Sequence, residues 1–265
     1  MRRVVSLFLP MWSTDRYRKN TGDAPPRDKP VVMATKIGPR RVIVAADKAA
    51  QALGLRAGLT VAHAQALVPE LHVAESTPEA DDEGLTRLAT WCMRYSPLVA
   101  ADRPNGVWIE VAGSAHLFGG EEALLQDLTR RLRRAGVNAR AAIADTPGAA
   151  WAVARNSPER IIVPGGMAAA IAELPVAALR LPVETVDALR RLGVERIGQL
   201  AAMPNAPLTR RFGPDVRRRL DQALGHAAEP FDALMPPDII RRRLAFRQPR
   251  GPFQRRHEAL WRSLQ

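Results

Sequence analysis

An apolar stretch near the start of the chain, Val4-Val5-Ser6-Leu7-Phe8-Leu9-Pro10-Met11-Trp12, has the pattern of a buried strand that runs into a turn. Much further along, Asn105-Gly106-Val107-Trp108-Ile109-Glu110-Val111 predicts a second core strand. Three segments have helical spacing, at 78–95, 121–135 and 147–155. One further strand is predicted at 139–143. The resulting order of strands and helices is compatible with a split βαβ sheet.

The residues between the first strand and the first long helix predict a small unit in which strands and helices alternate. Short β-like runs at 31–34 and 41–45 flank Gly38-Pro39, a combination that favours a hairpin. Two short helices are expected after the hairpin, and Pro69 closes the second of them.

After Pro164-Gly165-Gly166 the pattern becomes wholly helical. Proline and glycine separate the predicted short helices at 167–174, 183–192, 197–203, 208–212 and 214–224. Beyond Pro236-Pro237 the chain is dense in arginine and has few residues to bury, which predicts a linker and not a core.

The composition indicates a folded protein with a polyanionic partner. The 265 residues are 46% hydrophobic, and 39 Lys and Arg against 27 Asp and Glu give a net charge of +12. This charge favours nucleic acid first and an acidic membrane second, and the alternative is a basic surface that binds neither.

The single cysteine, Cys92, excludes a disulfide framework within the chain. No run approaches the roughly 20 apolar residues of a membrane span, so we expect a cytoplasmic protein with no membrane partner.

Three segments of the chain resemble the Y-family (UmuC-like) DNA polymerases. The fingers module is similar to the segment that begins Arg41-Val42-Ile43-Val44-Ala45-Ala46 and runs through Thr60, followed by 64–69. The palm is similar to the segment that begins Tyr95-Ser96-Pro97 and runs through 108–113. The thumb is resembled by Leu189-Arg190-Arg191-Leu192-Gly193-Val194, Ile197-Gly198-Gln199-Leu200-Ala201 and Arg210-Arg211-Phe212-Gly213. The resemblance extends over nearly the whole chain to about residue 240.

The resemblance implies an α/β fold joined to an all-α part. It assigns 1–10 and 76–165 to a split-βαβ, ferredoxin-like palm and 11–75 to small α/β fingers. It assigns 166–235 to an all-helical thumb with a helix-hairpin-helix, and 236–265 to an Arg-rich linker. A little finger would be absent or only begun, so the chain is compatible with a fragment of a longer protein.

The positions that carry the family's metal-binding carboxylates hold other residues here. By the resemblance, the first metal-binding aspartate falls at Leu7 and its neighbour near Leu9. The Asp-Glu pair of the second palm strand falls at Asn105 and Gly106. Glu110 does not replace that pair, because four residues span about 13 Å along a strand. Since two Mg²⁺ ions need carboxylate oxygens, the chain resembles the catalytically inactive ImuB-type branch and is expected to need no cofactor.

The positions that grip the triphosphate in the family have changed as well. The Tyr and Arg of the fingers correspond to Lys48 and Gln51. The lysine-rich turn of the palm corresponds to Thr146-Pro147-Gly148, with Trp151 at the later lysine.

Two other functions are compatible with the residues. A slip of the alignment by one or two residues would leave Asp15 or Asp102 as displaced ligands of Mg²⁺, which predicts an active error-prone polymerase. Each acid borders a turn, however, and is expected to be an exposed loop residue. The second alternative is a helix-hairpin-helix nucleic-acid-binding module without a polymerase role.

The helical region supplies the expected contacts to DNA phosphates. The turn Leu192-Gly193-Val194 favours backbone N–H groups aimed at a phosphate, and Arg180 stands where the family has a glycine-flanked hairpin. The candidate DNA-binding residues are Arg180, Gly193, Val194, Arg210, Arg211, Arg217, Arg218, Arg241 and Arg242. Arginine clusters suit phosphates, and the alternative is a solvated helix face.

The resemblance implies a non-catalytic DNA-binding scaffold in translesion synthesis and damage-induced mutagenesis, in the cytoplasm of a bacterium and associated with its nucleoid. Its implied partners are primer-template DNA, an error-prone replicative-type polymerase, a RecA-like accessory protein and the sliding clamp. Because the chain ends at Gln265, where a little finger should begin, we do not expect these residues alone to contact the clamp.

Overall fold

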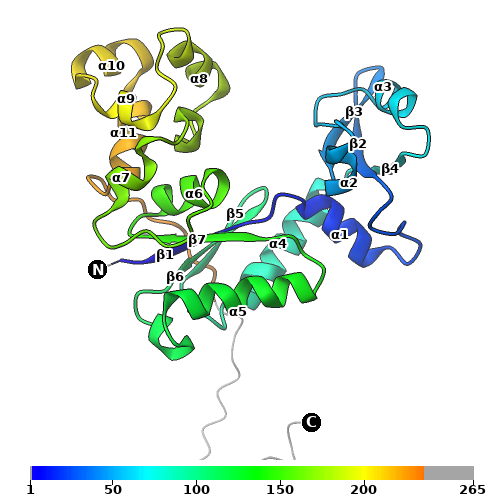
Figure 1. The fold of residues 1–265 in the computed structure, drawn as a ribbon, viewed down its shortest axis with the longest axis horizontal. Coiled ribbons are helices and arrows are strands. Elements are labelled where there is room, and N and C mark those ends of the chain that lie inside the picture. The colour runs from blue at the N-terminus through cyan, green and yellow to red at the C-terminus, as the bar shows by residue number, and fades with distance from the viewer. Residues whose placement is uncertain (1, 236–265) are drawn as a thin grey trace, which may run out of the picture. The chain divides into compact units, whose positions relative to one another are not determined.

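The computed structural model describes residues 2–235, which form two β-sheets and a series of helices (Figure 1). The larger sheet has the strand order β5-β6-β1-β7, and every neighbouring pair is antiparallel. Its strands are β1 (Val4–Phe8), β5 (Val99–Asp102), β6 (Gly106–Glu110) and β7 (Arg140–Ala144). The sequence predicts β1, β6 and β7 but not β5, whose four residues are too few to show a period.

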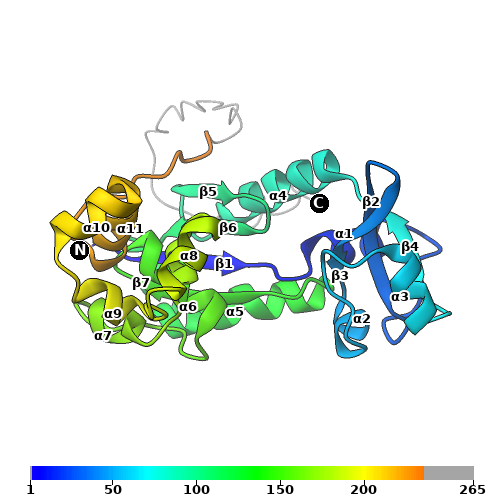
Figure 2. The same cartoon turned by 90° about the horizontal axis from the view of Figure 1, so that it is seen from above.

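Alternation along the strands gives the larger sheet two differently covered faces. Val5 and Leu7 of β1 pack with α4 (Pro78–Cys92) and α5 (Glu121–Arg134). Val4 and Phe8 face α6 (Pro147–Asn156) on the opposite side. Figure 1 shows α6 on one side of the sheet, and from above α4 and α5 lie on the two sides of β1 (Figure 2).

The smaller sheet has the order β3-β2-β4 and builds a separate core. Strands β2 (Val31–Ile37) and β3 (Arg40–Ala46) form the predicted hairpin, and β4 (His72–Glu75) joins β2 in parallel. The helices that pack on this core are α2 (Lys48–Ala52) and α3 (Val61–Leu67), whereas α1 (Trp12–Asn20) places Trp12 in the core under the larger sheet. Asp47 caps α2 by accepting from the Ala50 N–H.

The predicted helical region is confirmed. It contains α7 (Met167–Ala172), α8 (Val183–Arg190), α9 (Ile197–Ala201), α10 (Asn205–Phe212) and α11 (Pro214–Leu224), with a short 3₁₀ turn at Val176–Leu179. Another 3₁₀ turn, Ala115–Phe118, lies between β6 and α5. The expected linker at 236–265 lies outside the described residues, and the proposed domain boundaries stay predictions. None of the helices within 2–235 is long and apolar enough to cross a bilayer.

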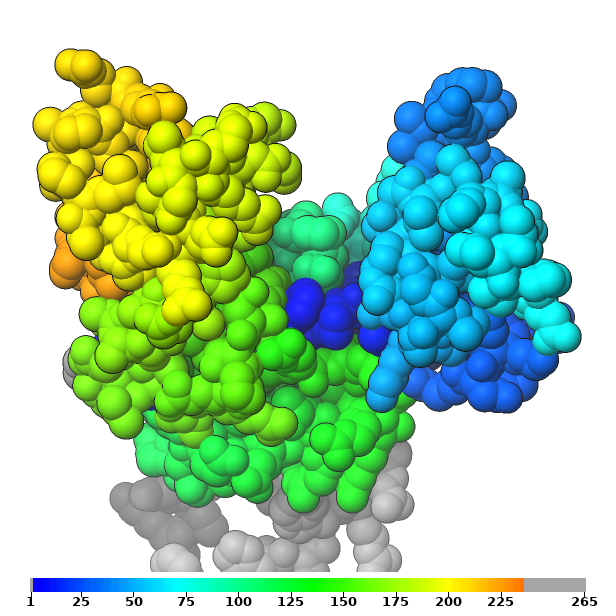
Figure 3. Space-filling view, turned by 45° about the horizontal axis from the view of Figure 1, so that its top comes forward, coloured from blue at the N-terminus to red at the C-terminus, as the bar shows by residue number. Residues whose placement is uncertain are grey.

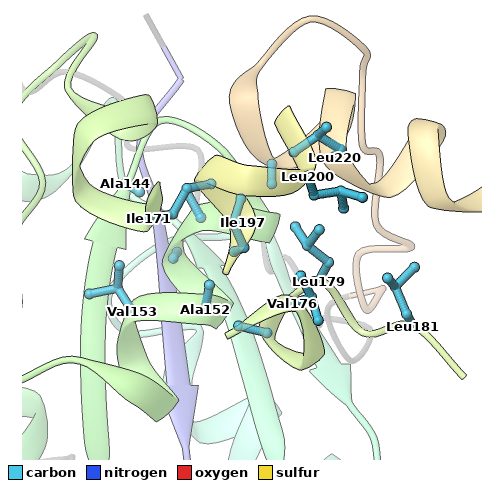
Figure 4. Packing of buried hydrophobic residues seen from close by; sticks show 14 of the residues in the cluster. Ala144, Ala152, Val153, Ile171, Val176, Leu179, Leu181, Ile197, Leu200 and Leu220 are labelled. Atoms are coloured by element: carbon cyan, nitrogen blue, oxygen red, sulfur yellow. The ribbon is translucent and has the colours of Figure 1, made fainter. Parts of the chain in front are cut away.

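Helix α6 joins the larger sheet to these helices through one continuous apolar core. Ala152 and Val153 lie in it with Leu179, Ile197 and Leu220 from the helical region (Figure 4). The first turn of α6 approaches α11 closely, because the Thr146 hydroxyl donates to the Ala223 carbonyl at 2.9 Å. A Cβ on Gly148 would lie 3.0 Å from the Ala223 Cα, so only glycine fits this contact without a shift.

Gly148→Ala is therefore expected to lower the free energy of unfolding by about 1–2 kcal/mol, since overpacking against backbone outweighs the gain in helix propensity. Gly113→Ala is the matched control, because its Cβ would meet nothing within 4 Å. The control is expected to stay within about 0.5 kcal/mol of the unchanged protein in urea unfolding. Equal stability of both variants would contradict the close approach of α6 and α11.

Candidate nucleic-acid interface and the site beside Gly106

The pairing of β1 with β6 decides which side chains lie beside Gly106. Phe8 pairs with Gly106, whereas Leu7 pairs with Val107. Directly opposed residues of antiparallel strands share a face, so the β1 side chain on the Gly106 face is that of Phe8. Leu7 and Leu9 are both 0% exposed and lie in the core under α4 and α5.

The space beside Gly106 is filled by an ion pair. Arg155 of α6 and Asp102 of β5 approach within 3.3 Å, and their side chains are only 10% and 17% exposed. A Cβ on Gly106 would lie 2.7 Å from Asp102 Oδ2 and 3.1 Å from Arg155 Nη2. The pair therefore occupies the volume that any longer residue at position 106 would need.

Two aromatic rings hold the guanidinium of Arg155 in place. Its central carbon lies 3.9 Å from the ring centre of Trp151 and 4.4 Å from that of Phe8. Its Nη1 also donates to the Ser6 hydroxyl at 3.4 Å. Stacking on both rings favours the planar arginine cation over a hydrated lysine.

Burial dominates the electrostatics of this pair. Desolvation lowers the pKa of Arg155 to about 10, against the opposing effect of Asp102. Desolvation likewise raises the pKa of Asp102, although Arg155 and Arg180 lower it. Each charge is thus costly to bury alone and depends on its partner.

The residues present do not fit a pair of Mg²⁺ ions. Asp102 is engaged by Arg155, and the Asn105 carbonyl accepts from the Leu9 N–H at 2.9 Å. Asp15 lies in α1, where its oxygens accept from the backbone and side-chain N–H groups of Asn138 at 2.7 and 2.9 Å. Within 2–235, no three His, Cys, Asp or Glu side chains gather as a metal site would require.

The expectation that Asp15 and Asp102 are exposed loop acids is wrong. Asp15 is 4% exposed and lies within a helix, and Asp102 ends a strand. Each acid borders a turn in the sequence, but its burial comes from partners that lie far away in the chain, Asn138 for Asp15 and Arg155 for Asp102.

The face above β1 is hollowed, and the N-terminal segment, drawn in dark blue, lies at the bottom of the hollow (Figure 3). One pocket of about 500 Å³ is lined by Pro10, Gln51, Arg56 and Asn105, with Asp81 and Asp82 at its wall. Gln51 is bound to the Ala46 carbonyl at 2.8 Å. Arg56 is the only cation among the lining residues, and two acids oppose it, so the lining is ill suited to a triphosphate.

Arg180 is not a free phosphate ligand. It adopts a left-handed backbone conformation with φ of 59°, and its guanidinium pairs with the buried carboxylate of Glu229. It also lies 5.8 Å from the rings of Trp108 and Trp151. Arg180 therefore ties the helical region to the chain after α11, which corrects its predicted role as an available DNA contact.

The turn at Gly193 does not offer free backbone donors. The Gly193 N–H donates to the Arg190 carbonyl at 2.9 Å, and the Val194 N–H donates to the Leu189 carbonyl at 3.0 Å. Gly193 has φ of 77°, which allows this helix-ending turn. The expectation that these two N–H groups point at a phosphate therefore fails, because α8 itself uses them.

The remaining candidate arginines divide into paired and unpaired groups. Arg217 pairs with Asp221 and Arg218 with Asp215, at 2.8 and 2.9 Å. Arg210 and Arg211 of α10 are exposed, and no carboxylate of the described residues lies within 4 Å of either. Arg241 and Arg242 lie outside the described residues. Two arginines of α10 thus remain as the available candidates.

Sequence reasoning missed the cluster of Phe8, Asp102, Trp151 and Arg155. Trp151 and Arg155 are four residues apart on α6, so their spacing alone predicted a shared helix face. Their approach to Phe8 and Asp102 depends on how α6 crosses the sheet, which no local pattern contains.

Arg155→Met is expected to lower the free energy of unfolding by about 3 kcal/mol, because it leaves a buried carboxylate without a partner. The double variant Arg155→Met with Asp102→Asn should recover most of this loss. Arg103 and Asp82 form the matched control, since they too are 3.3 Å apart but roughly half exposed. Arg103→Met should cost under about 1 kcal/mol. Additive effects of the two substitutions at 102 and 155 in urea unfolding would refute the coupling.

Solved structures with a similar fold include DinB from Sulfolobus solfataricus, with a TM-score of 0.68 at 16% identity over 87% of this chain and 69% of that one. A post-insertion binary complex of Dbh DNA polymerase gives a TM-score of 0.69 at 15% identity over 86% and 68% of the two chains. At these identities the likeness shows the fold alone.

Two relatives are similar in sequence. Protein ImuB of Caulobacter vibrioides (strain NA1000 / CB15N) is 50% identical over 198 residues, which cover 74% of this chain and 43% of that protein. DNA polymerase IV of Dehalococcoides mccartyi (strain CBDB1) is 28% identical over 211 residues, 78% of this chain and 54% of that protein. The chain thus spans about half the length of these curated relatives.

The model of the impB/mucB/samB family matches residues 22–155, half of the chain, and covers β5 and β6 as well as α6 up to Arg155. The matched residues include strands of both sheets, so one family model spans the smaller sheet and part of the larger one. The chain belongs to the impB/mucB/samB family, the UmuC-like group of Y-family DNA polymerases.

Proposed function

We propose that this protein is a non-catalytic, DNA-binding scaffold of translesion synthesis and damage-induced mutagenesis in bacteria. It retains the polymerase fold but not the metal chemistry, and it holds primer-template DNA while other proteins extend the primer. The 50% identity to Protein ImuB, against 28% to DNA polymerase IV, supports assignment to the ImuB-type branch.

The observation that carries the proposal is the ion pair beside Gly106. By the resemblance, polymerisation needs carboxylates on β1 and at Asn105 and Gly106, and the strand register puts Phe8, and not Leu7, beside Gly106. Their shared face holds the ring of Phe8 and the hydrogen of Gly106, with Arg155 and Asp102 in the space between sheet and α6. A fixed guanidinium repels a divalent cation, so the site opposes metal binding and does not simply lack ligands.

The alternative of an active polymerase with relocated ligands needs Asp15 or Asp102 to be free to bind a metal ion. Asp15 and Asp102 are bound to Asn138 and Arg155, and each belongs to a different element of the fold. The alternative of a helix-hairpin-helix module without polymerase ancestry is contradicted by membership of the family.

Phosphate contacts are proposed for the exposed Arg210 and Arg211 of α10, with backbone binding and little base recognition. The net charge of +12 supports a polyanionic partner. We further propose that the protein acts at the nucleoid, beside an error-prone replicative-type polymerase and a RecA-like accessory protein.

Primer extension tests the absence of catalysis. On a template-primer duplex with Mg²⁺ or Mn²⁺, the protein is expected to bind the duplex and to add no nucleotide. A Y-family polymerase on the same duplex is the positive control. Extension that Asp102→Asn abolishes, with binding intact, would refute the scaffold and favour relocated metal ligands.

Arg210→Ala with Arg211→Ala should weaken duplex binding and reduce the slope of log K against log salt by up to about two units, one for each phosphate contact removed. Arg133→Ala, an exposed arginine at the end of α5, is the matched control. Fluorescence anisotropy across a salt series gives both slopes. An unchanged slope in the double variant would rule out α10 as the DNA contact.

A further inference from the structure

A second surface, distinct from the Gly106 site, lies where α1, α4 and α5 meet. A groove of about 650 Å³ is lined there by residues of the three helices and by Val137. Its walls rest on the face of the larger sheet that carries Leu7, whereas Phe8, Gly106 and α6 belong to the other face. The groove is therefore separate from the polymerase-like site.

The charged side chains that line the groove are all basic. Three of them already have acidic partners outside the lining, because Arg16 pairs with Asp81, Arg87 with Glu83 and Arg131 with Asp127. The other three are Lys19, Arg94 and Arg134, which are exposed. Among residues 2–235, no carboxylate lies within ion-pair distance of these three.

The floor of the groove is apolar and aromatic. Trp12, Leu88, Trp91 and Leu132 contribute to it, and Trp91 is only partly buried. The Arg94 guanidinium lies 4.2 Å from the centre of the Trp91 ring, and its Nε donates to the Trp91 carbonyl at 3.2 Å. These two contacts fix Arg94 before any partner arrives. A partly exposed tryptophan beside a preorganised arginine is the composition found at the centre of protein interfaces.

This combination selects one kind of occupant. An apolar floor ringed by unpaired cations is complementary to a peptide that carries both carboxylates and an apolar side chain. Nucleic acid would satisfy the cations but would leave the floor without an apolar partner, because backbone recognition relies on phosphates. The chain's own residues 236–265 are rich in arginine, so their charge opposes binding here.

We propose that the groove between α1, α4 and α5 binds an acidic segment of a partner protein. An aromatic or aliphatic side chain of that segment packs on Trp91 and Leu88, and its carboxylates pair with Arg94, Arg134 and Lys19. The protein then presents two binding surfaces, α10 for DNA and this groove for a protein.

The test uses a fluorescein-labelled synthetic peptide in which Asp and Glu surround a central Phe and Leu, and the full 265-residue chain. Arg94→Glu and Arg134→Glu are each expected to weaken its binding about tenfold in anisotropy, because they reverse a charge at the rim. Arg133→Glu makes the same change one residue away on α5, outside the groove, and should weaken binding less than about twofold. Trp91→Ala should also weaken it, and an all-Glu peptide should bind less tightly than the probe.

Circular dichroism and urea unfolding establish that each variant is folded. Equal effects of Arg133→Glu and Arg134→Glu would overturn the proposal, since net charge alone would then explain binding. Displacement of the peptide by single-stranded DNA with the same dependence on Arg94 and Trp91 would assign the groove to nucleic acid instead. A loss of self-association in Arg134→Glu, seen by sedimentation, would assign it to a second copy of the chain.

Discussion

The apolar core around α6 is the constraint on which the rest of the structure depends. The helix is rich in alanine, and its small side chains let it lie closely between the larger sheet and the helices that follow it. Gly148 at its first turn meets Ala223 of α11, and Ala144 before it continues the same core into β7. Bulkier residues would move the helical region away from the sheet. The position of Arg155 at the end of α6, and so the chemistry beside Gly106, follows from this packing.

The ion pair beside Gly106 changes what this face of the sheet can do. In a two-metal site, carboxylates gather around divalent cations that carry the charge. In this chain the cation is a guanidinium fixed between Phe8 and Trp151, and a single carboxylate, Asp102, balances it. The ion pair fits here because Gly106 has no side chain and leaves the space that Arg155 and Asp102 fill.

The two faces of the larger sheet provide separate surfaces because strand side chains alternate. Neighbouring residues such as Leu7 and Phe8 contribute to different cores and serve different purposes. The face with α6 bears the pair of Arg155 and Asp102, and the helices α4 and α5 on the other face frame the basic groove. A scaffold that binds DNA and protein together needs such a separation, since like charges on one surface would compete for the same partners.

The sequence by itself determined most elements of the fold, because apolar periodicity and the proline and glycine breaks are local properties. It placed β1, β6, β7, the hairpin of β2 and β3 and the helices α4, α5, α6 and α11, and it indicated that Asn105 and Gly106 lack carboxylates. Only the tertiary structure decided that Phe8, and not Leu7, shares the face of Gly106, since that depends on strand register. It alone decided that Arg180 is occupied by Glu229 and that Arg155 meets Asp102. These partners lie about fifty residues apart in the chain, and only the packing of α6 and α11 brings them within reach.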